Sequence, residues 1–197
     1  VNAGDMNGDG LDDMVVATNS GHAYLVFGQT AGGVSINLTA PDITKFVAIA
    51  DEVNSVGQSS ISTIGDVNGD GYDDFLLLAG GQNPVVTDNT ASDFADKDSG
   101  AVFVVYGKAR NAWSEKLSAD NLGGDGLAIT GGLPQDQFGF SAATGDFNDD
   151  GVTDMIVGMP TNQKDGYNSG EAFVINGGDY SDSLIQTGTT GNDTIRG

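Results

Sequence analysis

The sequence predicts an all-β protein built from about three four-stranded antiparallel units of the kind that form propeller blades. Short runs rich in Val, Ile, Phe and Tyr alternate with glycine and asparagine turns, and no convincing helical periodicity appears. An acidic nonapeptide occurs three times, each copy directly before an apolar run. The copies begin at residues 5, 66 and 146, so they lie 61 and 80 residues apart. This spacing suits units of four short strands each.

The expected strands recur in the same order in each unit. The acidic loop leads into an apolar run, a glycine and a second alternating run follow, and a further run precedes the strand that enters the next loop. The first unit begins at its acidic loop and lacks a leading strand, and residues 183–187 offer a fourth strand for the third unit. Residues 116–122 could form one helical turn. The strands are expected at residues 14–18, 21–28 and 46–51, at 75–80, 100–107 and 126–132, and at 155–160 and 170–177.

The second spacing between acidic loops is longer than the first mainly because of one polar segment. Residues 80–99 contain most of the extra positions and are rich in Asn, Asp, Ser and Thr. We interpret them as a surface loop inserted between two strands, which repeat architectures tolerate. Because binding specificity commonly resides in variable loops, this segment is the most conspicuous candidate for ligand contact.

Each acidic loop fits the pattern D-x-N-x-D-G-x-x-D, as DMNGDGLDD, DVNGDGYDD and DFNDDGVTD. Side-chain oxygens at loop positions one, three, five and nine can converge on one point, and position seven can add its backbone carbonyl. The glycine at position six permits the sharp turn that this requires. Three carboxylates this close repel one another unless a cation lies between them. The alternative is three acidic hairpin turns, but a turn needs only the central residues and leaves the flanking aspartates unexplained.

The pattern therefore predicts about three metal sites, and Ca²⁺ is the expected ion. All donors are oxygen atoms, there is no cysteine, and the single His22 lies outside every loop. Five protein donors per site exceed what Mg²⁺ commonly uses. The residue at position eight is expected to point away from the metal. The predicted ligands are Asp5, Asn7, Asp9, Asp13 and the carbonyl of Leu11; Asp66, Asn68, Asp70, Asp74 and the carbonyl of Tyr72; and Asp146, Asn148, Asp150, Asp154 and the carbonyl of Val152.

Composition limits the partners of the chain. The formal net charge is −21, from 28 acidic and 7 basic residues, and three calcium ions would change it only to about −15 (−21 + 6). Nucleic acid and anionic membrane surfaces are poor partners for such a surface, and no apolar run reaches the length of a membrane span. An acidic, lysine-poor, cysteine-free and glycine-rich chain suggests a bacterial protein that is secreted or displayed at the cell surface, where calcium is available.

The third unit resembles the FG-GAP repeat of integrin α-subunit propellers and their bacterial relatives. It contains FGFSAATGDFNDDGVTDMIVGMP at residues 138–160, in which FG opens the unit and GMP stands for Gly-Ala-Pro. The middle unit fits more loosely, with VG at 56–57 and LAG at 78–80. The resemblance covers residues 1–178 and implies a calcium-binding propeller, usually of seven blades. Residues 1–178 would then be part of a propeller whose other blades come from the same protein or another chain.

The tail, residues 179–197, shows a second and weaker resemblance. GTTGNDTIRG at its end is similar to the glycine- and aspartate-rich nonapeptide of RTX proteins, with one glycine replaced by threonine. The resemblance implies that the tail leads into an RTX-type repeat. The alternative is a polar tail that follows the last blade.

The sequence offers little for catalysis, and we expect no enzymatic activity. There is no cysteine, no GxSxG motif and no complete phosphate loop, and the other units do not repeat the single histidine. The leading interpretation is a binding module for adhesion or surface recognition, with a protein or glycan as partner and with structural calcium. One alternative is a non-catalytic accessory propeller of a secreted hydrolase or lyase. Another is a subunit of an extracellular filament or sheath.

Overall fold

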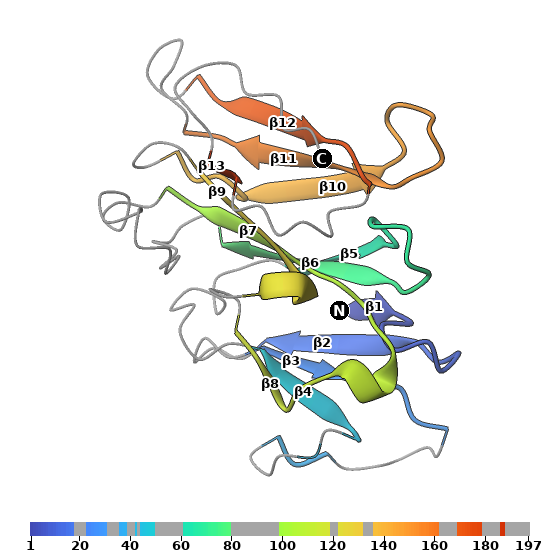
Figure 1. Ribbon diagram of the computed structural model, residues 1–197. Coiled ribbons are helices and arrows are strands. Elements are labelled where there is room, and N and C mark those ends of the chain that lie inside the picture. The colour runs from blue at the N-terminus through green and yellow to red at the C-terminus, as the bar shows by residue number, and fades with distance from the viewer. Residues whose placement is uncertain are drawn as a thin grey trace.

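Three β-sheets make up the described part of the computed structural model, and they stack in the order of the three sequence units (Figure 1). Neighbouring strands are mainly antiparallel, so the predicted all-β fold class is confirmed. The structure describes residues 1–17, 23–30, 36–38, 42, 44–49, 61–79, 99–118, 122–131, 136–161, 169–178 and 186–187. The predictions for His22, for most of the polar segment 80–99 and for the RTX-like tail at 188–197 fall outside these residues.

The first sheet has the strand order β1-β2-β3-β4-β8. Its first four strands pair antiparallel, and β8 joins the outer edge of β4 in parallel. The strands are β1 (Asn2–Gly4), β2 (Asp13–Ala17), β3 (Ala23–Val26), β4 (Phe46–Ile49) and β8 (Lys116–Leu117).

Two features of this sheet correct the sequence predictions. A leading strand is present, because the few residues before the acidic loop suffice: Val1 and Val15 exchange two backbone hydrogen bonds of 2.9 Å. Residues 116–117 form a strand and not a helical turn, because the edge of β4 offers backbone partners. Ala48 on that edge donates to the Glu115 carbonyl at 3.1 Å, and Leu117 is buried in the core.

The second sheet has the order β13-β9-β7-β6-β5, and the third has the order β10-β11-β12. Residues 186–187 were predicted to belong to a fourth strand of the third unit. They pair instead in parallel with the outer edge of β9, which would otherwise have no strand beside it. In the same way, β8 pairs in parallel with the outer edge of β4. The strands are β5 (Ile61–Gly65), β6 (Asp74–Ala79), β7 (Ala101–Val105), β9 (Gly126–Thr130), β13 (Gln186–Thr187), β10 (Ser141–Gly145), β11 (Asp154–Met159) and β12 (Glu171–Ile175).

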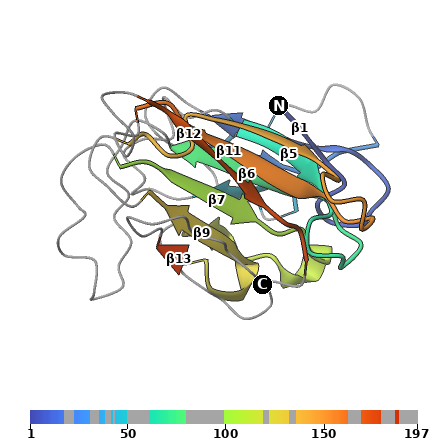
Figure 2. The same ribbon diagram turned by 90° about the horizontal axis from the view of Figure 1, so that it is seen from above.

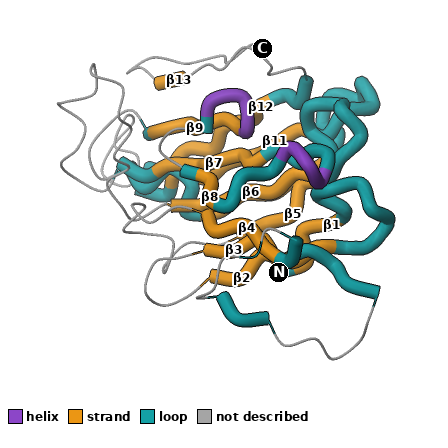
Figure 3. The backbone as a smooth tube through the Cα atoms, turned by 60° about the horizontal axis from the view of Figure 1, so that its bottom comes forward, coloured by secondary structure: helices purple, strands orange, loops and turns teal. Residues whose placement is uncertain are grey.

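Two short 3₁₀ helices lie in the connection between β7 and β9, on either side of β8 (Figure 3). They are η2 (Arg110–Ala112) and η3 (Gly123–Asp125). No helix within the described ranges is long and apolar enough to cross a membrane.

The core consists of two layers, one on each face of the second sheet. Seen from above, the third sheet overlies the second (Figure 2). Side chains alternate along a strand, so Phe75 and Leu77 of β6 pack toward the first sheet while Leu76 and Leu78 pack toward the third. Every residue of β6 and β7 is buried, because the second sheet is covered on both faces. The middle unit therefore shows what a fully enclosed blade of this chain buries.

Among the described strands, none covers the outer face of the first sheet or of the third sheet. Met14 of β2 is 47% exposed, whereas Phe75 and Met155, which occupy the equivalent position in the other units, are 0% exposed. Val174 of β12 is 53% exposed, whereas the equivalent Val104 of β7 is 0% exposed. This pattern is consistent with part of a propeller.

Candidate metal sites

The three acidic segments are hairpin loops at one end of the stacked sheets (Figure 1). We name them loop 1 (residues 5–13, between β1 and β2), loop 2 (66–74, between β5 and β6) and loop 3 (146–154, between β10 and β11). The carboxylate at position one closes each loop. One of its oxygens accepts the amide of position six at 2.8 Å, and the other accepts the amide of position five at 3.1 Å, in all three loops.

The glycine at position six has φ values of 84°, 91° and 87° in the three loops. This left-handed conformation strains other residues, so the structure explains why each loop has glycine there. The carboxylate at position five accepts the amide of position seven at 3.0, 3.0 and 2.8 Å. The backbone of Leu11, Tyr72 and Val152, whose carbonyls are predicted ligands, is held in this way.

Position nine anchors each loop to the third strand of its sheet. Asp13, Asp74 and Asp154 are 2%, 0% and 0% exposed. One oxygen accepts the amide of position two at 3.0, 2.9 and 2.8 Å, and the other accepts, at 2.8 Å, the amide of a glycine that follows the third strand. The sequence reasoning treated these residues only as ligands. The recurring glycine at 28, 107 and 177 is the signal that it missed.

The carboxylates within a loop interact unfavourably. Burial raises the pKa of Asp13 to about 6, and the neighbouring Asp9 adds to the rise, although the amide of Gly28 opposes it. Burial also raises the pKa of Asp74 to about 7, with further contributions from Asp70 and Asp66. Asp9 therefore lies close enough to repel Asp13 in loop 1, as Asp70 and Asp66 do to repel Asp74 in loop 2, and a bound cation would relieve this repulsion.

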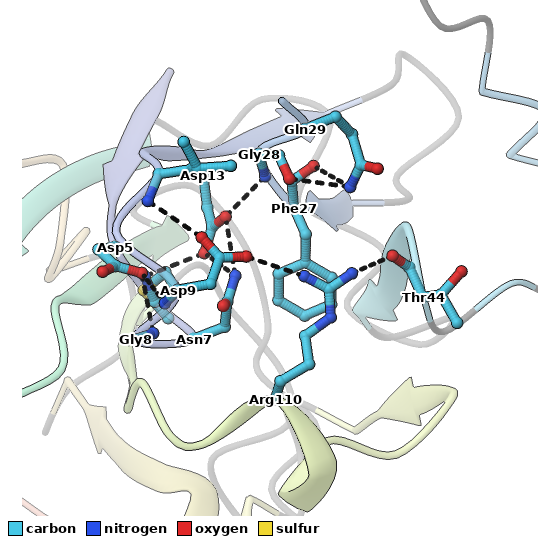
Figure 4. A network of polar contacts seen from close by, with 12 residues as sticks. Asp5, Asn7, Gly8, Asp9, Asp13, Phe27, Gly28, Gln29, Thr44 and Arg110 are labelled. Atoms are coloured by element: carbon cyan, nitrogen blue, oxygen red, sulfur yellow. Dashed lines mark hydrogen bonds and ion pairs between the residues drawn. The ribbon is translucent and has the colours of Figure 1, made fainter. Parts of the chain in front are cut away.

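Position three divides the loops into two kinds. Asn68 and Asn148 donate their side-chain amides to the position-five carboxylate of their own loops, at 3.0 and 2.7 Å. Asn7 donates instead to both oxygens of Asp13, at 3.1 and 3.0 Å (Figure 4). The Asn7 carbonyl oxygen is buried and has no hydrogen-bond partner. A buried oxygen without a donor is costly, and a cation is a suitable partner for it.

The donor chemistry fits a hard cation, with carboxylate and amide oxygens close together in each loop. The structure brings the predicted ligands of each loop into one turn but closes that turn with backbone hydrogen bonds. Within the described residues, no three acidic or histidine side chains converge as a metal-binding group. Calcium binding therefore stays a prediction, to be tested by experiment.

Position eight connects neighbouring units. Asp73 of loop 2 accepts the amide of Asp5 in loop 1 at 2.8 Å, and its own amide donates to the Asp5 carbonyl at 3.3 Å. Two further backbone hydrogen bonds of 2.9 Å join loops 1 and 2 to the next unit, where residues 108 and 178 donate to the position-two carbonyls. Loops 1 and 2 are thus tied to the sheets that follow them.

One cation reaches loop 1 from the second unit. Arg110 of η2 lies with Nη1 3.2 Å from an oxygen of Asp9, and its Nη2 donates to the carbonyl of Thr44 (Figure 4). Its guanidinium carbon lies 4.3 Å from the centroid of the Phe27 ring. Loop 1 therefore has a protein cation at the edge of its acidic cluster.

Comparison with known proteins agrees with this architecture. Residues 138–175, which contain loop 3 and all the described strands of the third sheet, match the FG-GAP repeat. Over 188 residues, 88% of this chain, the sequence is 32% identical to integrin alpha pat-2 of Caenorhabditis briggsae and 31% identical to integrin alpha pat-2 of Caenorhabditis elegans. The chain spans 13% of the length of each of these relatives. FG-GAP repeats of the integrin-α type are typically non-catalytic.

Proposed function

We propose that this chain is a calcium-binding segment of an integrin-α-like β-propeller, within a large secreted or cell-surface protein that acts in adhesion or surface recognition. The observation that carries the proposal is the common closure of the three acidic loops, each at the same end of its sheet. Composition favours a bacterial source outside the cytoplasm. The partner would be a protein or glycan, and further propeller blades from the same protein or another chain would complete the ring.

The role proposed for calcium is structural. About three ions, one in each loop, would replace carboxylate repulsion with attraction and fix the hairpin between the first two strands of each blade. Because loops 1 and 2 contact the units that follow them, filling a loop would also stiffen the junction between blades. No step of catalysis is assigned to the metal, and the chain itself is proposed to have no enzymatic activity.

Thermal unfolding with and without calcium tests the structural role. Affinities of extracellular calcium modules are on the order of 10⁻⁴–10⁻³ M. Calcium at ten times Kd would then stabilise the fold by about 1.4 kcal/mol for each site filled. The melting temperature should rise with millimolar calcium and fall again on addition of a chelator. A melting temperature that does not respond to either would contradict calcium binding.

The recognition role calls for a separate experiment. Cells that display the full-length protein should attach to at least one surface in a panel coated with extracellular proteins or glycans, and a chelator should reduce this attachment. Deletion of residues 1–178 should have the same effect as the chelator. Attachment that is equal with and without these residues would show that the adhesion function lies elsewhere in the protein.

A further inference from the structure

Arg110 distinguishes loop 1 from the other two acidic loops. It belongs to η2, in the second unit, yet its side chain contacts three separate segments of the first unit (Figure 4). These contacts are the ion pair with Asp9, the hydrogen bond to the Thr44 carbonyl and the approach to the Phe27 ring. Arg110 and Asp9 are 33% and 32% exposed, so solvent only partly screens this pair.

The oxygen that Arg110 binds has another partner in loops 2 and 3. There, Oδ2 of position five accepts the side-chain amide of position three, at 3.0 and 2.7 Å. In loop 1 the guanidinium takes this oxygen at 3.2 Å. Asn7 turns to Asp13 instead, and its own carbonyl oxygen is left buried without a partner.

The sequence indicates that loop 2 has no equivalent of Arg110. Arg110 stands three residues after the glycine at 107, and the residue three positions after the equivalent glycine at 177 is Tyr180. Tyrosine carries no positive charge, so the third unit does not repeat the cation at this position. A cation beside one loop can therefore make the metal affinity of that loop differ from the affinities of the other loops.

We propose that Arg110 is a built-in counter-ion of loop 1 that competes with calcium for Asp9, so that loop 1 is the weakest of the three calcium sites. This inference rests on the proposed function. A guanidinium that shares a ligand carboxylate with a divalent ion repels that ion, and at a partly exposed site the repulsion weakens binding by about tenfold. Without calcium the same guanidinium offsets the repulsion between carboxylates. Calcium in loop 1 must in turn weaken the contact between Arg110 and Asp9 by the same factor.

The competition couples loop 1 to the junction between the first and second sheets. Arg110 connects η2 to Asp9 of loop 1, to Thr44 before β4 and to Phe27 after β3. The ring of Phe27 also packs edge-on against Trp113, the single tryptophan of the chain, with centroids 5.9 Å apart. Tryptophan fluorescence therefore offers a local signal for filling of loop 1, separate from loops 2 and 3.

The test is a calcium titration of the full chain by calorimetry and by Trp113 fluorescence, with the variant Arg110→Met. Methionine keeps an apolar stem over the Phe27 ring and removes the charge. The matched control is Lys108→Met. The backbone amide of Lys108 contacts loop 1 and is kept in this variant, whereas its ammonium lies 4.8 Å from the Trp113 ring centroid and pairs with Asp125 at 2.6 Å, a residue outside the acidic loops.

The wild-type chain should show two tighter sites and one weaker site, and the weaker one should correspond to the fluorescence change. Arg110→Met should tighten that site about tenfold, leave the other two unchanged and lower the melting temperature in chelator. Lys108→Met should leave all three affinities as they are.

Two results would overturn the proposal, and they can be distinguished. If the wild-type chain binds calcium but Arg110→Met leaves the weak site unchanged or weakens it further, only the role of Arg110 is wrong. If the wild-type chain binds no calcium, the proposed function fails together with it. An equal tightening in Lys108→Met would show a general charge effect and would also contradict a specific role for Arg110.

Discussion

The carboxylate at position nine of each acidic loop accepts one amide from its own loop and one from the glycine after the third strand. These bonds are made by a buried charged group, which makes each of them stronger than a neutral hydrogen bond. Loss of such a side chain leaves two buried donors without partners. Position nine is therefore important for the fold whether or not a metal is present.

Adjacent residues of loop 1 provide a direct test. Asp13→Ala removes the acceptor for the amides of Met6 and Gly28 and should lower the free energy of unfolding by about 3 kcal/mol. Asp12→Ala removes an exposed carboxylate that accepts the side-chain amide of Asn2 and should cost less than about 0.5 kcal/mol. Urea denaturation in chelator measures both variants without a contribution from calcium. A loss for Asp13→Ala no larger than that for Asp12→Ala would show that the two amides find other partners.

The raised pKa values of Asp13 and Asp74 predict a pH dependence with a definite sign. Their folded-state pKa values are about 6 and about 7, above the ordinary value of 3.8, because burial disfavours the charged form. Between about pH 4 and pH 7 the folded state holds protons that the unfolded state releases, so stability without calcium should fall as pH rises through this window. Above pH 7 this contribution should level off.

Calcium should oppose this trend, because it binds the ionised carboxylates. Its apparent affinity should increase from pH 5.5 to pH 7.5 as the protons leave. Denaturation curves at several pH values, in chelator and in millimolar calcium, would show both effects. The double variant Asp13→Asn and Asp74→Asn should lose much of the pH slope in chelator, and an unchanged slope would assign it to other groups.

At the scale of the elements, the sequence predicts strands where apolar alternation is long enough to recognise. The runs around residues 14–18, 75–80 and 155–160 became β2, β6 and β11 within one residue at their described ends. The two-residue strand β8 was not predicted, and β13 was predicted as a strand of the wrong unit, because the pairing of such short strands depends on an open edge elsewhere in the fold and not on their own periodicity. The loop pattern gave the predicted ligands but not the side-chain rotamers. In loop 1 Asn7 donates to Asp13, and the Asp9 oxygen accepts from Arg110, which is 101 residues away in sequence.

The loss of one metal site should destabilise mainly the unit that contains it. Asp150→Ala removes the position-five carboxylate of loop 3 and the acceptor for the amide of Val152. Calorimetry should then count one calcium ion fewer, and hydrogen exchange should show loss of protection chiefly in β10, β11 and β12, because repeat stability depends on each unit and its neighbours. Asp149→Ala, a change at a non-ligand position of the same loop, should leave the number of ions unchanged. Equal loss of protection in all three sheets would indicate that the units unfold as one.

For the whole molecule, the arrangement of three sheets gives equivalent residues different surroundings. Leu25, Val104 and Val174 occupy the same position in the third strands of the three units. Leu25 packs toward the second sheet and Val104 packs toward the third. Leu25 and Val104 are 0% exposed and Val174 is 53% exposed. The third sheet thus exposes an apolar side chain at a position where the first two units bury the equivalent one.

A pair of charged substitutions measures this difference. Val104→Glu places a carboxylate between two sheets and should destabilise the fold by more than about 4 kcal/mol. Val174→Glu should change stability by no more than about 0.5 kcal/mol and should reduce any self-association of the chain. Urea denaturation and sedimentation velocity give the two readouts. A large loss of stability in Val174→Glu would show that the outer face of the third sheet is already covered.

The pairing of β8 with β4, and of β13 with β9, has a consequence for protein synthesis. The ribosome makes the chain from the N-terminus, and domains begin to fold as they emerge. The first sheet cannot be completed until residue 117 has left the exit tunnel, well after β7 of the second unit, and the second sheet must wait for residue 187. Each nascent blade therefore shows a bare edge while the following one is translated. A translational pause or premature stop between residues 50 and 116 would prolong this exposure, when strand-to-strand aggregation between neighbouring nascent chains is easiest.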